Sequence, residues 1–243
     1  TRHKEQNTAK RLKGKNPVYT FELPSGTAAT LRPITGNEES LLTDRRLMKN
    51  GTAVNQVLLN CLESLGGNEK PSMEDILVLL SGDRLFLLVK LRQISFGDEV
   101  ALSLHCPDPY CGEDNPVEIN LEDLEITPYP SEREFRFKLP RSEKEVVFVP
   151  LDGHMEKRLV ALKNPTIHSA MLMRIKEMGG KPPTRKAFLD LPAYDLNALR
   201  GEMRKKDGGI DTVIKTSCLA CGTAIQTRLE AEPAFLFPQA ATL

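Results

Sequence analysis

The sequence predicts an α+β fold built from two similar halves that one metal site joins, and three observations lead to this prediction. Two segments more than a hundred residues apart each alternate apolar and polar residues around a proline-containing turn and then begin a helix. In both segments a later helix, a glycine and a cysteine follow at the same spacing. Each segment closes with a pair of cysteines, so the two halves together supply four thiols.

Composition limits the classes to which the protein can belong. The chain has 243 residues, 40% of them hydrophobic, which is enough to bury an ordinary core. Lys and Arg number 33 and Asp and Glu also number 33, so no net field attracts nucleic acid or an anionic membrane. No run of about eighteen apolar residues predicts a membrane span, and no secretion signal is recognised near the start. We therefore expect a reducing compartment, where five cysteines favour metal binding over disulfides.

Residues 1–16 are predicted to form a flexible basic arm. They contain six Lys and Arg residues against one Glu, and Leu12 is their one apolar residue larger than alanine. Such a segment buries too little surface to offset the entropy lost on ordering. We expect the arm either to stay solvated or to become ordered on a partner.

Two later segments share one plan of a β-hairpin followed by a helix. The first is FELPSGTAATLRPITGNEE, residues 21–39, and the second is FKLPRSEKEVVFVPLDGHMEK, residues 137–157. When Leu23 is aligned with Leu139, a one-residue insertion in the turn brings Gly36 onto Gly153, where each helix is predicted to begin.

The similarity continues beyond these hairpins at a constant spacing of 112 residues. An apolar repeat of four is typical of any amphipathic helix, but an arginine, a glycine and a cysteine at the same offset make chance a poor explanation. We interpret the pattern as an internal duplication. The matched pairs are Asp83 and Asp195, Leu87 and Leu199, Leu91 and Met203, Arg92 and Arg204, Gly97 and Gly209, and Cys106 and Cys218.

The duplication predicts the domain organisation. Each half should contain a β-hairpin, a helical middle and a hairpin that carries two cysteines, and a proline-rich linker should join the halves. The predicted boundaries are a basic arm at 1–16, a first half at 17–125, a linker at 126–134, a second half at 135–238 and a tail at 239–243.

The two cysteine pairs predict a structural metal site. Four residues separate Cys106 from Cys111, two separate Cys218 from Cys221, and a glycine follows each pair. The flanking residues 99–105, 116–120, 211–217 and 224–229 are typical of strands, so each pair should lie at a hairpin tip rather than at a redox-active helix start. Four thiolates form the closed tetrahedral set that zinc prefers, and we predict one structural zinc ion per chain. Iron, a disulfide pair or two free pairs are the alternatives.

The remaining candidates for site chemistry are few. Cys61 lies on a helical apolar stripe and should be a buried small hydrophobe. His105 should point away from the cysteines on its strand, and His154 and His168 fall in helices without ligand partners at useful spacing. No phosphate loop, dinucleotide fingerprint, nucleophile elbow or zinc-protease motif is present. The sequence therefore predicts a protein without enzymatic activity, catalytic residues or a small-molecule substrate.

Four pieces of the sequence resemble the baseplate hub and hub-assembly family of T4-like contractile phage tails, with relatives in contractile injection particles. They are LRPITGNEESLL, a helix ending near LNCLESLGG, LSGDRLFLLVKLRQISFGDEVALSLHCPDPYCG, and CLACGTAIQTRLEAEPAFLFP near the chain end. The resemblance spans residues 17–238. It implies a structural or assembly component of a tail baseplate, assembled in the host cytoplasm and placed in the virion tail or an equivalent particle.

The resemblance implies other baseplate or tail proteins as partners, and self-association is left open. The rival interpretation is a nucleic-acid-binding zinc-ribbon protein, since cysteine knuckles and basic tails occur there too. The neutral charge balance, the scarcity of aromatic residues and the acidic first knuckle, CPDPYCGED, all disfavour it. We expect neither a nucleic acid nor a membrane as a partner.

The chain end contains Phe235, Leu236 and Phe237 in succession, which is too much apolar surface to leave in water. We expect these residues to cover the core of the second half, with a contact to a neighbouring subunit as the alternative.

Overall fold

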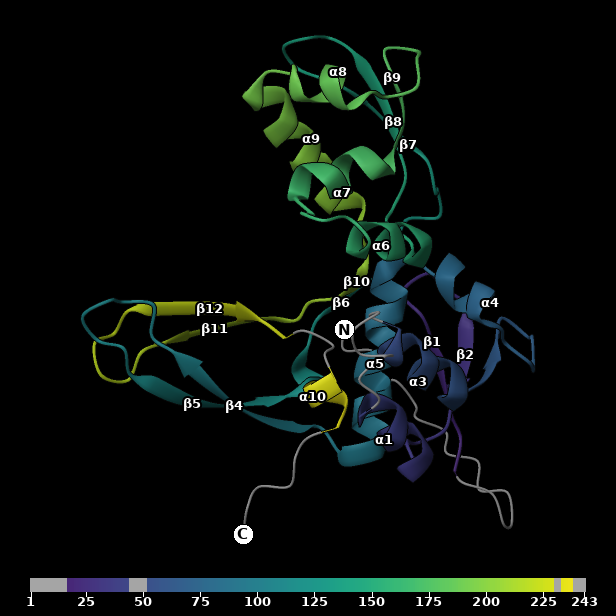
Figure 1. Ribbon diagram of the computed structural model, residues 1–243, viewed down its shortest axis with the longest axis vertical. Helices are drawn as coiled ribbons and strands as arrows, with labels where there is room; N and C mark the ends of the chain where they lie inside the picture. Colours follow the sequence, from purple (N-terminus) through teal and green to yellow (C-terminus); the bar gives the residue numbers. More distant parts are fainter. Residues whose placement is uncertain (1–16, 44–51, 230–232, 238–243) are drawn as a thin grey trace.

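The computed structural model describes residues 17–43, 52–229 and 233–237. The predicted basic arm at 1–16 and tail at 239–243 lie outside these ranges. Helices and antiparallel strands are mixed along the chain, so the predicted α+β class is confirmed (Figure 1). Within the described ranges, no helix is both long and apolar enough to cross a lipid bilayer.

The described helices and strands follow the same order in the two halves from the first strand to the long helix that precedes each cysteine hairpin. The first half contains β1 (Tyr19–Glu22), β2 (Ala28–Leu31), α1 (Gly36–Thr43), α3 (Ala53–Cys61), β3 (Leu62–Leu65), α4 (Met73–Val78), α5 (Ser81–Phe96), β4 (Glu99–His105) and β5 (Asp114–Asn120), followed by a 3-10 turn (Leu121–Asp123) and β6 (Ile126–Thr127). The second half contains β7 (Phe135–Lys138), β8 (Glu145–Phe148), α6 (Gly153–Val160), α7 (Ile167–Arg174), β9 (Ile175–Met178), α8 (Arg185–Leu189), α9 (Ala193–Lys206), β10 (Gly209–Ile210), β11 (Val213–Ser217), β12 (Ala224–Arg228) and α10 (Pro233–Leu236).

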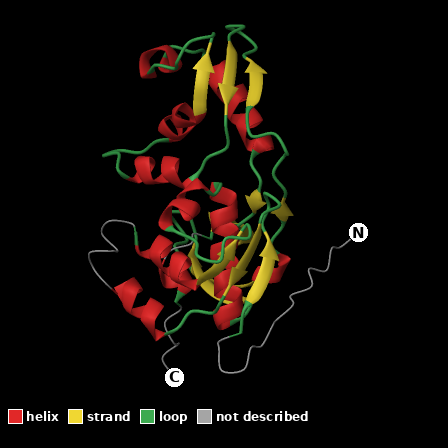
Figure 2. Cartoon of the chain, turned by 90° about the vertical axis from the view of Figure 1, so that its right-hand side faces the viewer, coloured by secondary structure: helices red, strands yellow, loops and turns green. Residues whose placement is uncertain are grey.

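Each half contains a three-stranded antiparallel sheet, where the sequence predicted only a hairpin (Figure 2). The orders are β1-β2-β3 and β7-β8-β9, and in both sheets the register of the third strand shifts before the last residue of the middle strand. The third strand starts directly after a helix, at Leu62 in one sheet and at Ile175 in the other. A turn with a left-handed glycine, Gly66 or Gly179, then follows each third strand.

A buried aspartate at the start of a long helix fastens the hairpin turn in each half. Asp83 on α5 accepts a hydrogen bond from the Ser25 backbone N–H at 3.0 Å. Asp195 on α9 accepts from the N–H groups of Arg141 and Ser142 at 2.8 and 2.9 Å. Because a buried carboxylate is costly without partners, these bonds fix how each helix sits under its turn.

The two halves approach closely at a set of glycines. Strand β6 pairs with β10, so part of the predicted linker 126–134 is a paired strand. A Cβ atom on Gly82 would lie 2.3 Å from the Gly208 carbonyl oxygen, and one on Gly208 would lie 2.7 Å from the Tyr129 ring. The Tyr129 hydroxyl also accepts a hydrogen bond from the Gly82 N–H at 3.0 Å. Larger residues would therefore push the halves apart at this junction.

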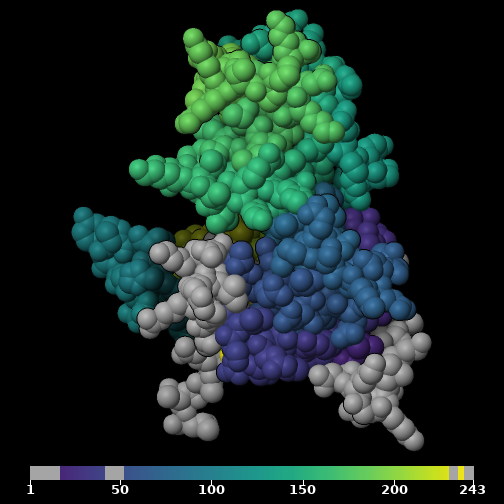
Figure 3. Space-filling model, turned by 45° about the vertical axis from the view of Figure 1, so that its right-hand side comes forward, coloured from purple at the N-terminus to yellow at the C-terminus, as the bar shows by residue number. Residues whose placement is uncertain are grey.

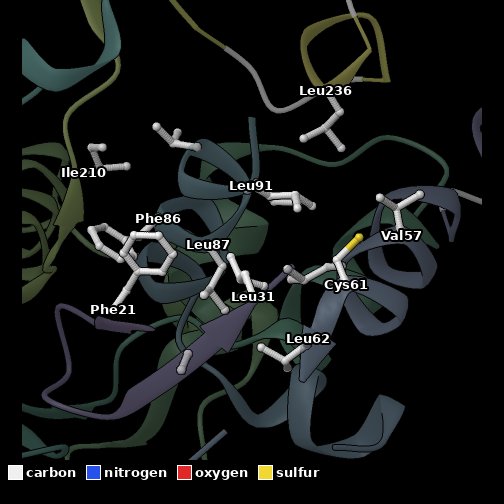
Figure 4. Close-up of a cluster of buried hydrophobic side chains, with 14 of the residues drawn as sticks. Phe21, Leu31, Val57, Cys61, Leu62, Phe86, Leu87, Leu91, Ile210 and Leu236 are labelled. Atoms are coloured by element: carbon white, nitrogen blue, oxygen red, sulfur yellow. The ribbon is translucent and has the colours of Figure 1, made fainter. Parts of the chain in front are cut away.

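The core of the first half includes side chains from the end of the chain (Figure 4). Ile210, Ile214, Leu229 and Leu236 are all buried in it, together with residues of β1, β2, α3 and α5. A second cluster fills the space between β7, β8, α7, α8 and α9.

The C-terminal apolar residues dock, as predicted, but on the other half. Leu236 is fully buried in the core of the first half, and the ring of Phe237 meets that of Phe96 edge to face at 5.1 Å. The expectation that they cover the core of the second half is therefore wrong. The chain returns to the first half through β10, β11 and β12, and α10 then packs against α5.

Candidate metal centre

Two antiparallel hairpins carry the four predicted cysteines. Strand β4 pairs with β5 along all seven residues, and β11 pairs with β12 along all five. The strands lie where the sequence predicted them, each hairpin is a separate two-stranded sheet, and the two project together from the body (Figure 1). We call this pair of hairpins the double hairpin.

Alternation along the strands gives each hairpin an inner face and an exposed outer face, and the inner face is mostly apolar in the first hairpin but mixes isoleucine with threonine in the second. Leu104 of β4 and Ile225 of β12 meet in one small cluster with the cysteines, so the inner faces converge near the tips. The outer face of the first hairpin carries Glu99, Asp114 and Glu118, all exposed. Because only a few apolar residues join the hairpins, packing alone contributes little to holding their tips together.

Each cysteine pair encloses a tight turn with a left-handed glycine. The Cys106 N–H donates to the Glu113 carbonyl at 2.9 Å, and the Cys218 N–H donates to the Thr223 carbonyl at 2.8 Å. Gly112 and Gly222, which follow the second cysteine of each pair, have φ values of 61° and 75°. Side chains with a Cβ atom disfavour this region, which explains the glycine after each pair.

The turns bring the four sulfur atoms into one cluster. Cys106 Sγ lies 3.6 Å from Cys221 Sγ, and Cys111 Sγ lies 3.7 Å from Cys218 Sγ. All four sulfur atoms lie within 4.8 Å of one another. Disulfides need sulfur atoms about 2.05 Å apart, whereas four thiolates about 2.3 Å from a central ion lie about 3.8 Å apart. The cluster therefore has the size of a tetrahedral metal site and could hold a metal ion.

The protonation of the four thiols differs between the hairpins. The backbone N–H of Cys221 lowers the pKa of Cys218 to about 6, and the Thr223 hydroxyl lowers the pKa of Cys221. The pKa of Cys106 rises to about 12, because burial and the neighbouring thiols outweigh the lowering effect of the Asp108 backbone N–H. The thiols of the second hairpin therefore lose their protons more readily than the Cys106 thiol, and a bound cation would favour the thiolate form of all four.

Asn115 is a buried amide that connects the two tips and that sequence reasoning missed. Its Nδ2 donates to the carbonyls of Leu104 and Glu113 at 3.3 and 3.0 Å, and its Oδ1 accepts from the Leu219 N–H at 2.8 Å. The side chain is 2% exposed and lies opposite Leu104 in the register of the hairpin. A polar residue in an otherwise apolar inner row was the signal that could have revealed it.

The other candidate residues of the sequence are not members of the cluster. Cys61 is buried on α3, where burial raises its pKa to about 12. His105 is exposed with its Nδ1 3.0 Å from Asp114 Oδ1, His154 on α6 contacts Glu74, and the ring of His168 on α7 meets that of Phe188 edge to face. Among the described residues, the four cysteines are the only His, Cys, Asp or Glu side chains that converge as a possible metal site.

Comparison with known families gives one match. A family model described as T4 bacteriophage base plate protein matches residues 16–135. This range includes the first hairpin with Cys106 and Cys111, whereas Cys218 and Cys221 lie beyond it. Neither the curated proteins nor the solved structures gave a match. The resemblance seen in the sequence is therefore confirmed over this range, because residues 16–135 are similar to the T4 bacteriophage base plate protein family.

Proposed function

We propose that this protein is a non-enzymatic structural or assembly component of a contractile tail, clamped by one zinc ion at Cys106, Cys111, Cys218 and Cys221. Its similarity to the family supports a place in the tail baseplate and association with other baseplate or tail proteins. Assembly in the host cytoplasm and a place at the hub, or in a related injection particle, belong to the same proposal.

The observation that carries the zinc proposal is the geometry of the sulfur cluster. Two hairpins that are 112 residues apart in sequence place four sulfur atoms at the spacing of a tetrahedral site. Zinc favours four thiolates in closed structural sites, and a saturated site of this kind leaves no position for a substrate. Its proposed role is thus mechanical, which agrees with a structural family rather than an enzyme.

A metal clamp would supply stability that the double hairpin otherwise lacks. Isolated two-stranded hairpins are marginally stable in water, and beyond the sulfur atoms the tip cluster contains only Leu104 and Ile225. Binding free energy at a structural zinc site becomes folding free energy, because the unfolded chain holds no preformed site. The ion would keep the projecting double hairpin in one shape for contact with neighbouring subunits.

We further propose that the two halves arose by duplication of one unit. Their matching sheet orders, register shifts and helix-start aspartates support this proposal. A duplicated unit offers two related surfaces, which suits a component of an assembly with repeating partners.

The outer surface of the first hairpin disfavours nucleic acid as the main partner. No Lys or Arg occurs between Gln93 and Glu132, and Glu99, Asp114 and Glu118 are exposed on its strands. A phosphate backbone would be repelled by such a face. Binding to DNA that weakens steeply with salt and survives removal of residues 1–16 would instead support the zinc-ribbon interpretation.

Metal analysis and hydrogen exchange test the zinc clamp. We expect about one zinc ion per purified chain, and loss of zinc in Cys218→Ser with faster exchange in residues 99–120, which lie on the other hairpin. Cys61→Ser is the matched control, because Cys61 lies outside the cluster and should leave zinc in place. Absence of zinc, bound iron instead, or altered exchange confined to residues 211–230 would contradict a shared zinc site.

A further inference from the structure

The tip of the double hairpin exposes two large apolar side chains. Tyr110 is 98% exposed and Leu219 is 80% exposed, more than any other large hydrophobic residue in the described part of the chain. Tyr110 precedes Cys111 and Leu219 follows Cys218, and the sulfur atoms of these two cysteines are 3.7 Å apart. The two residues therefore lie at the same end of the double hairpin, and we call them the tip knob.

Hydrogen bonds hold the backbone of the tip knob in place. The Tyr110 N–H donates to Asp108 Oδ1 at 2.8 Å, and the Leu219 N–H donates to Asn115 Oδ1 at 2.8 Å. Aromatic and aliphatic side chains on an ordered support lose little conformational entropy on binding, which is typical of interface anchors. The double hairpin stands apart from the rest of the described chain (Figure 3), and the exposed fractions of the two side chains show that no other described residue covers them.

The charge around the tip knob indicates what kind of surface it fits. Asp108, Glu113 and Asp114 lie on the first knuckle, and no Lys or Arg lies on either knuckle. A complementary partner surface would combine an apolar floor with a basic rim.

The junction between the halves contains a cleft with these properties. It encloses about 730 Å³, and its lining includes the apolar side chains Leu85, Leu88 and Ile210. Lys157 and Arg228 also line it, while Glu156 is already paired with the buried Arg84. The lining therefore carries positive charge beside an apolar floor, and we call this site the junction cleft.

We propose that the tip knob of one copy of this chain inserts into the junction cleft of a second copy. Charge complementarity selects this occupant, since the acidic tip meets a basic rim and two apolar side chains meet an apolar floor. The double hairpin projects away from the body, so a molecule's own tip does not enter its own cleft (Figure 1). Knob and cleft are different surfaces, so the contact is heterologous and each copy can bind one neighbour at each site, which gives a ring or an open chain.

Sedimentation velocity of the full chain over a range of concentrations tests the apolar contact. We expect self-association that weakens at least tenfold in both Tyr110→Ser and Leu219→Ser, with metal content and circular dichroism unchanged. The matched controls are Tyr194→Ser and Leu189→Ser, because these residues are 58% and 47% exposed on the second half and do not line the cleft. The controls should associate like the wild type.

A charge exchange tests the pairing of tip and cleft. Glu113→Lys and Lys157→Glu should each weaken association, and the two changes in one chain should restore it, because each new lysine again meets a glutamate on the neighbour. A chain that stays monomeric at all concentrations, tip variants that associate like the controls, or a double variant no better than the single ones would each overturn the proposal. Zinc content is measured on the same samples, so a failure of this contact is distinct from a failure of the zinc clamp.

Discussion

Replacing Asn115 with alanine should loosen the cysteine cluster without removing any sulfur. The amide is buried between the two tips and makes one hydrogen bond to the second hairpin and two within the first. Alanine deletes all three bonds but leaves the four thiols in place. The variant therefore isolates the contribution of the supporting amide from that of the cysteines themselves.

The size of the effect follows from which partners lose their bond. The Glu113 carbonyl still accepts from the Cys106 N–H at 2.9 Å, so the Leu219 N–H is the donor that loses its side-chain acceptor. Each of the three deleted hydrogen bonds contributes about 0.5–1.5 kcal/mol net, so their joint loss accounts for a cost of about 2 kcal/mol. At about 1.4 kcal/mol per tenfold change, a cost of about 2 kcal/mol corresponds to about a 30-fold loss of metal affinity. This lies within the range of about 10–100-fold for residues that support metal ligands.

Competition with a zinc chelator measures this loss directly. We expect Asn115→Ala to release zinc at a chelator concentration about 30-fold lower than the wild type, with faster exchange of the Leu219 amide. Gln226→Ala removes an exposed amide from the outer face of the other hairpin and should change neither quantity. Wild-type zinc affinity together with wild-type exchange at Leu219 would refute the role assigned to Asn115.

Three further predictions concern the body of the protein. Cys61→Ser should lower the free energy of unfolding by about 1–3 kcal/mol in denaturant titrations while zinc is retained, because it buries a hydroxyl in the core; loss of zinc would contradict this. Leu236→Ala should lower the free energy of unfolding by about 2–5 kcal/mol, because it leaves a cavity in the core of the first half. Leu189→Ala, at a 47% exposed position, should lower it far less. Equal effects in denaturant titrations would show that α10 does not stabilise the first half. Burial raises the pKa of Glu38, but hydrogen bonds from Arg32 and Thr35 outweigh it and lower that pKa from 4.5 to about 2. The stabilisation by the Glu38 carboxylate is therefore fully present above pH 4.5 and is lost as the pH falls toward 2. The difference in the free energy of unfolding between the wild type and Glu38→Gln should vanish over that pH range. A difference that does not change with pH would refute this prediction.

The strands of both cysteine hairpins were predictable because their signals are local. Alternating apolar residues define the strands, and a glycine after each cysteine pair marks a turn that needs a left-handed backbone. The starts of helices α1 and α6 at Gly36 and Gly153 were predictable for the same reason. The duplication then suggested that the two cysteine pairs meet, and the structure brings their sulfur atoms together. That the cluster binds zinc stays a prediction.

The third strand of each sheet was not predictable from local pattern. Both strands are only four residues long, and each follows directly on a helix. Their charged residues, such as Glu63 and Lys176, occur as readily in helices as in strands. Pairing with the middle strand of the sheet makes them strands, and that partner lies about thirty residues earlier.

The sequence by itself determined the fold class, the positions of the cysteine hairpins and the need of the C-terminal apolar residues for cover. The tertiary structure decided which surface covers them, how Asn115 joins the two tips, and that β6 pairs with β10 across the junction. The physical reason is that backbone conformation follows from neighbours along the chain, through periodicity and turn chemistry. Burial of Leu236 against α5, or of an amide between two hairpins, depends on contacts between residues about a hundred or more positions apart, which no local pattern specifies.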